Sequence, residues 1–208
     1  MENPLVVLLQ VARVLEEQNI TYVLVGSLAS SMHGMYRSTA DIDLLADIKP
    51  EHVRPLLDAL NKSFYVDDHA MMQAVEQRRS FNAIHFDSVF KVDIFIPKGD
   101  DFGMKQLERR QLRKIAPESE QFVYVATAED TILAKLRWYR DGGEVSSTQW
   151  SDVLGILGVT DSSLEFDYLR EWSGRLGVRD LLDRALTSTR DRLSSWDREN
   201  SGTSTNNQ

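Results

Sequence analysis

The chain has 208 residues, of which 42% are hydrophobic, and carries a formal net charge of −8. This length allows one substantial core or one domain with a smaller helical addition, and the absence of cysteine excludes disulfides and thiolate metal sites. The sequence contains no run of roughly 20 apolar residues and no signal-peptide pattern at its start. We therefore expect a cytoplasmic protein without membrane contact, and the acidic charge argues mildly against a large nucleic-acid footprint.

The first part of the chain alternates helical and strand patterns. Helices are predicted where apolar residues recur every three or four positions, and strands where short runs are rich in β-branched and aromatic residues. In chain order these elements are helix 3–18, strand 21–25, helix 28–32, a strand opening at Asp41, a helix from Pro50, strands 81–86 and 90–97, a helix near 104–110, and strands 112–115 and 122–125. Asp87-Ser88 separates the two longer strands and is compatible with a turn, which predicts a hairpin.

The rest of the chain has helical patterns followed by a polar end. The predicted helices are 132–140, a segment from Ser146 through Leu157, 165–175 and 179–193. We therefore expect a mixed α/β core over residues 1–125, a helical part packed on it over residues 126–195, and a disordered tail over residues 196–208. The predicted fold class is α/β (α+β), with a mixed sheet flanked by helices.

Two aspartates at the start of the second strand have the pattern of a metal site. Side chains on a strand alternate between its faces, so Asp41 and Asp43 point the same way. Such close like charges repel each other unless a cation lies between them, and Mg²⁺ prefers carboxylate and phosphate oxygens. Asp93 repeats this arrangement on a later strand. We expect these three carboxylates to be catalytic and to bind Mg²⁺ or Mn²⁺.

A glycine turn, Gly26-Ser27, lies between the first strand and the helix that follows it. Backbone N–H groups at a helix start favour anions, phosphate among them. Together with the aspartates this predicts metal-assisted nucleotidyl transfer, in which two ions stabilise the attacking and leaving oxygens. The metal would be held by Asp41 and Asp43 with an NTP, the terminal phosphates by the turn and the Ser27 hydroxyl, and Asp93 would help to activate a hydroxyl nucleophile.

The order of these motifs resembles the DNA polymerase β-type nucleotidyltransferase superfamily. Its signature is a Gly-Gly or Gly-Ser turn, then Asp-x-Asp, then an Asp on another strand. More narrowly, GSLASSMHGMYRSTADIDLL resembles small bacterial nucleotidyltransferase-like proteins related to the AbiEii toxins, in which Arg-x-Thr-x-Asp-Ile-Asp is typical. The resemblance implies that Arg37 and Thr39 bind the nucleotide. The turn departs from the commoner Gly-Gly, because Ser27 replaces the second glycine.

The same resemblance extends to the helical part of the chain. Those relatives carry Lys-Leu-x-x-x-Arg on a helix and an Asp on the next helix, which complete the site. Lys135 and Arg137, in the run KLRWYR, and Asp152 stand in the corresponding region. The resemblance therefore implies that the two basic residues neutralise the triphosphate. A solvated helix face is the alternative interpretation of such a basic run.

Two classes of function remain open from the sequence. One is an enzyme that transfers NMP to a hydroxyl on an RNA end such as tRNA, on a protein side chain or on a small molecule such as an antibiotic. The other is a catalytically silent nucleotide-binding or interaction protein, such as one component of a toxin–antitoxin pair with a partner protein, because a fold does not determine a function.

Overall fold

The computed structural model describes residues 4–34, 41–99, 101–116, 119–160 and 163–201, with side chains up to residue 191. The chain divides into two compact units. The first comprises residues 1–32 and 36–127, and the second comprises residues 33–35 and 128–208.

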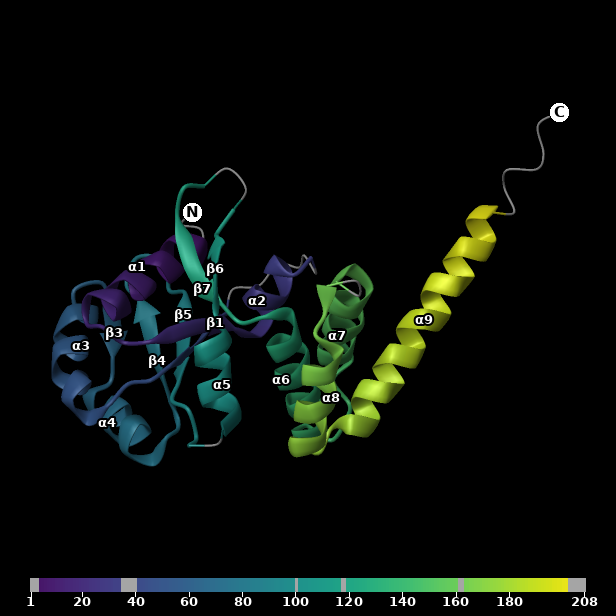
Figure 1. Cartoon of the computed structure of the whole chain (residues 1–208). Helices are drawn as coiled ribbons and strands as arrows, with labels where there is room; N and C mark the ends of the chain where they lie inside the picture. Colours follow the sequence, from purple (N-terminus) through teal and green to yellow (C-terminus); the bar gives the residue numbers. More distant parts are fainter. Residues whose placement is uncertain (1–3, 35–40, 100, 117–118, 161–162, 202–208) are drawn as a thin grey trace. The chain divides into compact units, whose positions relative to one another are not determined.

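The described part of the first unit is built on a seven-stranded mixed sheet with the strand order β3-β4-β5-β2-β1-β7-β6 (Figure 1). The strands are β1 (Tyr22–Val25), β2 (Ile42–Ala46), β3 (Phe64–Val66), β4 (Ser80–His85), β5 (Lys91–Phe95), β6 (Gln111–Lys114) and β7 (Phe122–Val125). β1 is antiparallel to β2 and parallel to β7, while β2 and β5 are parallel. The predicted hairpin is confirmed, because β4 and β5 pair in antiparallel register.

Helices cover both faces of this sheet. They are α1 (Pro4–Glu17), α2 (Gly26–Met32), the 3₁₀ turn η1 (Pro50–His52), α3 (Val53–Leu60), α4 (Asp68–Gln77) and α5 (Asp101–Arg109). α1, α3 and α4 pack on one face, where their apolar stripes meet the alternate strand residues Ile42 and Leu44. On the opposite face Leu107 of α5 packs with Val23 and Leu45. Because Asp43 lies between Leu44 and Ile42, it points to the α5 face.

Two elements were missing from the sequence prediction, β3 and α4. β3 is only three residues long, so its alternation is too short to recognise. α4 has little apolar character, and its start depends on a cap in which the Asp67 carboxylate accepts a hydrogen bond from Ala70 N at 2.7 Å. Arg78 ends the helix in the left-handed conformation, at a φ of 51°. Sequence periodicity therefore could not locate this segment.

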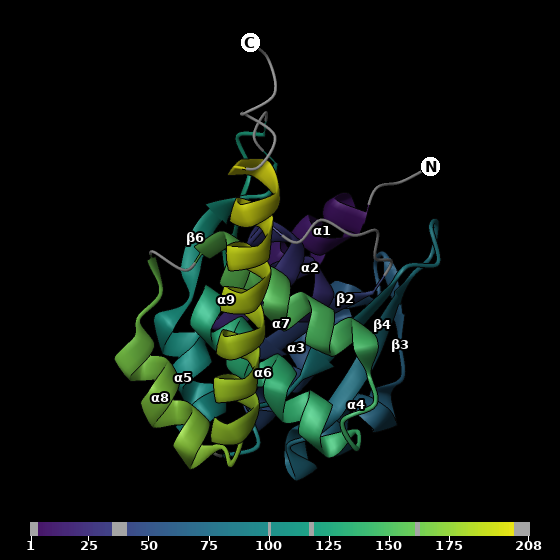
Figure 2. The same ribbon diagram turned by 90° about the vertical axis from the view of Figure 1, so that its right-hand side faces the viewer.

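The described part of the second unit is helical, with α6 (Ala128–Asp141), α7 (Ser147–Thr160), α8 (Phe166–Arg175) and α9 (Arg179–Ser201). α7 contacts both α6 and α9, and α8 also contacts both (Figure 2). Ile132, Ile156 and Leu182 are among the apolar residues buried in this unit. α9 continues to Ser201 and so overlaps the start of the predicted tail, which stays a prediction. Residues 202–208 lie outside the described part of the chain.

None of the helices in the described ranges is both long enough and apolar enough to cross a membrane.

Candidate functional site

A row of polar side chains crosses three neighbouring strands on the α5 face of the sheet. Asp43 of β2 is paired with Asp93 of β5, and Asp93 is paired with Asn82 of β4. Residues in register on adjacent strands point to the same face. Asp41 precedes β2 by one residue and is exposed. It lies two positions before Asp43, so strand alternation places both side chains on the same face. The fold therefore brings the three predicted carboxylates to one end of one sheet face.

Gly26 forms the junction between β1 and α2 and packs directly against Asp43. Its φ is +67°, in the left-handed region that favours glycine. A Cβ at this position would lie 2.7 Å from Asp43 Cγ and 2.9 Å from Asp43 Cβ, which is too close for any side chain. The hydroxyls of Ser30 and Ser31 donate hydrogen bonds to the carbonyls of Gly26 and Ser27 at 3.0 and 3.1 Å. The predicted turn is therefore adjacent to Asp43, one of the predicted carboxylates, in the structure.

Asp93 has two partners that the sequence analysis did not identify. Lys91 Nζ lies 2.7 Å from Asp93 Oδ2, and Asn82 Nδ2 donates a hydrogen bond to Asp93 Oδ1. The hydrogen bond to Asp93 is the main cause that raises the pKa of Lys91 above its usual value. Partial burial opposes this effect, and the negative charges of Asp93, Asp41 and Asp43 add to it. Lys91 therefore supplies a positive charge to this carboxylate group.

The donor chemistry of this face fits a hard divalent cation. Mg²⁺ is commonly bound by one or two carboxylates together with substrate phosphates, and Asp41 and Asp43 supply two. Among the described side chains, no group of three or more His, Cys, Asp or Glu residues could hold a metal ion. The third carboxylate, Asp93, is paired with Lys91 instead. A ligand set that includes all three aspartates stays a prediction.

Other predicted site residues belong to the second unit or lie outside the described ranges. Lys135 of α6 and Asp152 of α7 form an ion pair with 2.7 Å between Nζ and Oδ2, and their side chains are only 5% and 3% exposed. Lys135 Nζ also donates to Gln149 Oε1 at 3.2 Å. Arg137 is partly buried on the same helix. The predicted contacts of these residues with a triphosphate stay predictions.

Arg37 and Thr39, which the family resemblance places at the nucleotide, lie outside the described residues.

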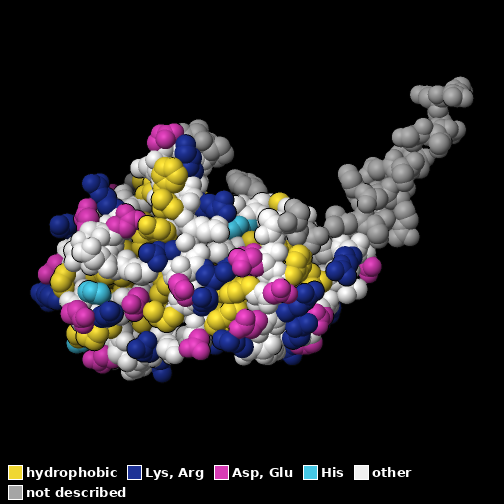
Figure 3. All heavy atoms as spheres, viewed as in Figure 1, with side chains coloured by type: hydrophobic (Ala, Val, Ile, Leu, Met, Phe, Trp, Pro, Cys, Tyr) yellow, Lys and Arg dark blue, Asp and Glu magenta, His cyan; other side chains and the backbone are white. Residues whose placement is uncertain are grey.

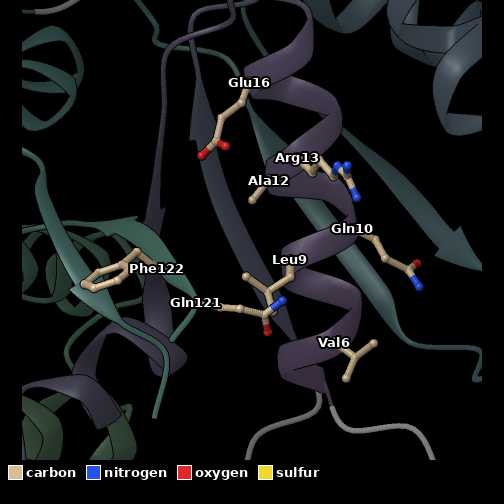
Figure 4. Close-up of a pocket in the computed structure, with 8 residues that line it drawn as sticks. All are labelled: Val6, Leu9, Gln10, Ala12, Arg13, Glu16, Gln121 and Phe122. Carbon is tan, nitrogen blue, oxygen red and sulfur yellow. The ribbon is translucent and has the colours of Figure 1, made fainter. Parts of the chain in front are cut away.

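A groove of about 630 Å³ lies on another part of the first unit, between α1 and the start of β7 (Figure 4). It is lined by Val6, Leu9, Gln10, Ala12, Arg13, Glu16, Gln121 and Phe122. These residues include none of the predicted site residues. The groove is therefore distinct from the carboxylate row.

Comparison with protein families gives one match that covers most of the chain. The model of the family described as "Nucleotidyltransferase of unknown function (DUF6036)" matches residues 4–156. This range contains every site residue predicted from the sequence. A comparison with curated proteins finds no match.

Solved structures with the same fold are also nucleotidyltransferase-like. An antigenic nucleotidyltransferase-like protein from Paracoccidioides brasiliensis has a TM-score of 0.53 at 17% identity, and the match covers 87% of this chain and 91% of that chain. ANT(2″)-Ia in complex with adenylyl-2″-tobramycin has a TM-score of 0.52 at 14% identity, with 84% and 97% covered. The predicted nucleotidyltransferase fold is thereby confirmed, while the narrower likeness to AbiEii-related proteins stays a prediction.

Proposed function

Because the chain belongs to the family of nucleotidyltransferases of unknown function whose model spans residues 4–156, we propose that it transfers NMP from an NTP to an acceptor hydroxyl with Mg²⁺ or Mn²⁺. The observation that carries this proposal is the row of Asp43 and Asp93 on adjacent strands, with Gly26 packed against Asp43. A structural role alone would not require a glycine backbone pressed against one of several clustered carboxylates.

The carboxylates of β2 and the glycine turn have separate roles in this proposal. Asp41 and Asp43 would hold the divalent ion, which when bound neutralises the triphosphate charge and polarises the α-phosphate. Gly26 brings the backbone of the turn next to Asp43, and Ser27 adds a hydroxyl, so that the phosphates meet hydrogen-bond donors beside the carboxylates. Positioning and charge neutralisation supply most of the rate enhancement in this class of reaction.

The proposed reaction is a displacement at the α-phosphorus. The oxygen of the acceptor hydroxyl forms a bond to the α-phosphorus, and the bond from that phosphorus to the α–β bridging oxygen breaks. Diphosphate leaves with the bonding electrons, and the hydroxyl proton passes to the Asp93 carboxylate and from there to water. The products are the acceptor with NMP attached and free diphosphate. An RNA end, a protein side chain and a small molecule each offer the required hydroxyl.

A labelling experiment tests this proposal. The purified chain is incubated with each α-³²P-labelled NTP, Mg²⁺ and one of three acceptor pools: total RNA, cell protein, or hydroxylated small molecules. We expect label to enter one pool, and Asp43→Asn to lower the rate by a factor of about 100 or more, because the variant loses a metal-binding charge while keeping its shape. Asp47→Asn, just beyond the other end of β2, is the matched control and should keep the wild-type rate.

Two results would contradict the proposal. One is transfer at the full rate by Asp43→Asn. The other is the absence of label from all three pools with the wild-type chain, which would favour a catalytically silent nucleotide-binding protein.

A further inference from the structure

The ion pair between Lys91 and Asp93 lies within the carboxylate row. Both side chains project from the same side of β5, because they are two positions apart. The Nζ to Oδ2 distance is 2.7 Å, and the Asp93 side chain is 17% exposed. The second oxygen of Asp93 accepts a hydrogen bond from Asn82. Both oxygens of this carboxylate therefore already have a donor from the protein itself.

The position of the Lys91 ammonium disfavours a second cation at Asp93. A divalent ion bound to Asp93 would share the carboxylate with the ammonium, and like charges at such a distance repel each other strongly in a partly buried site. Asp43 lies on the neighbouring strand, opposite Asp93. Asp41 lies two positions before Asp43, on the same face by strand alternation. An ion bound by these two residues and a triphosphate would not require a ligand from Asp93.

We propose that Lys91 supplies the positive charge at Asp93 that a second divalent ion would otherwise supply, so that the site binds one divalent ion. Lys91 acts here as a positioning residue, because its described contact is with Asp93. It holds the Asp93 carboxylate in a fixed place beside the acceptor hydroxyl. The inference rests on the proposed function, since it concerns the metal that this reaction uses.

Counting bound Mn²⁺ by electron paramagnetic resonance tests the inference without measuring activity. The full chain is titrated with Mn²⁺ at a saturating concentration of a non-hydrolysable NTP analogue, and the Mn²⁺ bound to free analogue is subtracted. We expect one ion per wild-type chain. Lys91→Met removes the ammonium and frees one Asp93 oxygen, so we expect this variant to bind two ions. The affinity for the second ion should be at least tenfold higher than any weak second binding by the wild type.

Two further variants make the result specific. Lys91→Arg keeps a cation that can reach Asp93 and should still bind one ion. Lys98→Met removes a lysine from an exposed position beyond the other end of β5, and it should also bind one ion. Lys91 has 45% of its side chain accessible and lies outside the apolar core, so we expect its replacement to leave the fold intact.

The outcomes separate this inference from the proposed function. Two ions in the wild type, or one ion in Lys91→Met, would overturn the role of Lys91 while metal-dependent nucleotide binding still stood. If neither chain bound the analogue in a Mn²⁺-dependent way, both the inference and the proposed function would be overturned.

Discussion

The contact between Gly26 and Asp43 sets the geometry of the site at the scale of single residues. The glycine allows β1 to turn into α2 at a positive φ, and its missing side chain leaves the space that the Asp43 carboxylate fills. A substitution here therefore has two separable effects, one on the backbone and one on the carboxylate.

We predict that Gly26→Ala lowers the free energy of unfolding and displaces Asp43. The left-handed conformation alone costs a residue with a Cβ about 1–2 kcal/mol, and the collision with Asp43 adds to this cost. Urea denaturation measures the stability, and calorimetric titration measures Mg²⁺-dependent NTP binding, which we expect to be lost.

Gly99→Ala is the matched control within the same unit. Gly99 also has a positive φ, +78°, but the atoms nearest to a Cβ there would be side-chain atoms of Arg78 at an ordinary 3.8 Å. This variant should pay the backbone cost and keep nucleotide binding. Equal losses of stability in the two variants, with binding retained in both, would show that the Gly26–Asp43 contact has no functional importance.

Several of these residues could be predicted from the sequence, and the reason is local. Strand alternation predicts the shared face of Asp41 and Asp43 and the similar position of Asp93. The turn at the end of the first strand predicts Gly26. Lys91 was missed although the same alternation places it beside Asp93. Asn82 could not be predicted, because its position depends on the register between β4 and β5, which no short motif specifies.

At the scale of elements, a buried ion pair connects α6 to α7. The Lys135 and Asp152 side chains are nearly inaccessible to water, and Gln149 supplies a further acceptor to the ammonium. The family resemblance implies that Lys135 neutralises the charge of a triphosphate. The family motif also placed Asp152 in the same site, and the structure adds that Lys135 contacts this residue directly although it lies on a different helix 17 residues away.

We predict that Lys135→Met alone is strongly destabilising, because it leaves the Asp152 carboxylate buried without its cation. Removing one partner of a buried pair typically costs about 3–5 kcal/mol, whereas replacing both partners by apolar residues is often close to neutral. The double variant Lys135→Met/Asp152→Leu should therefore recover most of the lost stability in urea denaturation. A double variant as unstable as the single one would refute this account of the pair.

Element prediction succeeded where amphipathic patterns are long and failed where they are short. α1 and the α3 stripe bury residues at regular helical spacing, so periodicity located them. β3 and α4 depend on sheet pairing and on a side-chain cap. In α9 the helix extends over a polar sequence to Ser201, beyond its predicted end at residue 193, because the low apolar content there gives no helical periodicity.

At the scale of the whole molecule, the family match spans the two structural units unevenly. Residues 4–156 include nearly all of the first unit, then α6 and most of α7, whereas α8 and α9 lie beyond the match. The family match therefore covers the sheet and the first helices of the second unit, and it does not include α8 and α9.

One face of the molecule carries charges of both signs. Acidic and basic side chains are interspersed on the face shown in Figure 3, and the net charge is −8. A triphosphate approaching such a surface depends on local cations and on a bound metal rather than on an overall attractive field. Metal dependence is for this reason the central property to test.

Titration calorimetry with each NTP, in the presence and absence of Mg²⁺, tests it most directly. The account predicts that the wild-type chain binds at least one NTP only when Mg²⁺ is present, and that the Asp41→Asn/Asp43→Asn variant, folded as judged by circular dichroism, does not bind it. Binding that needs no metal, or binding that the double variant retains in full, would contradict the account.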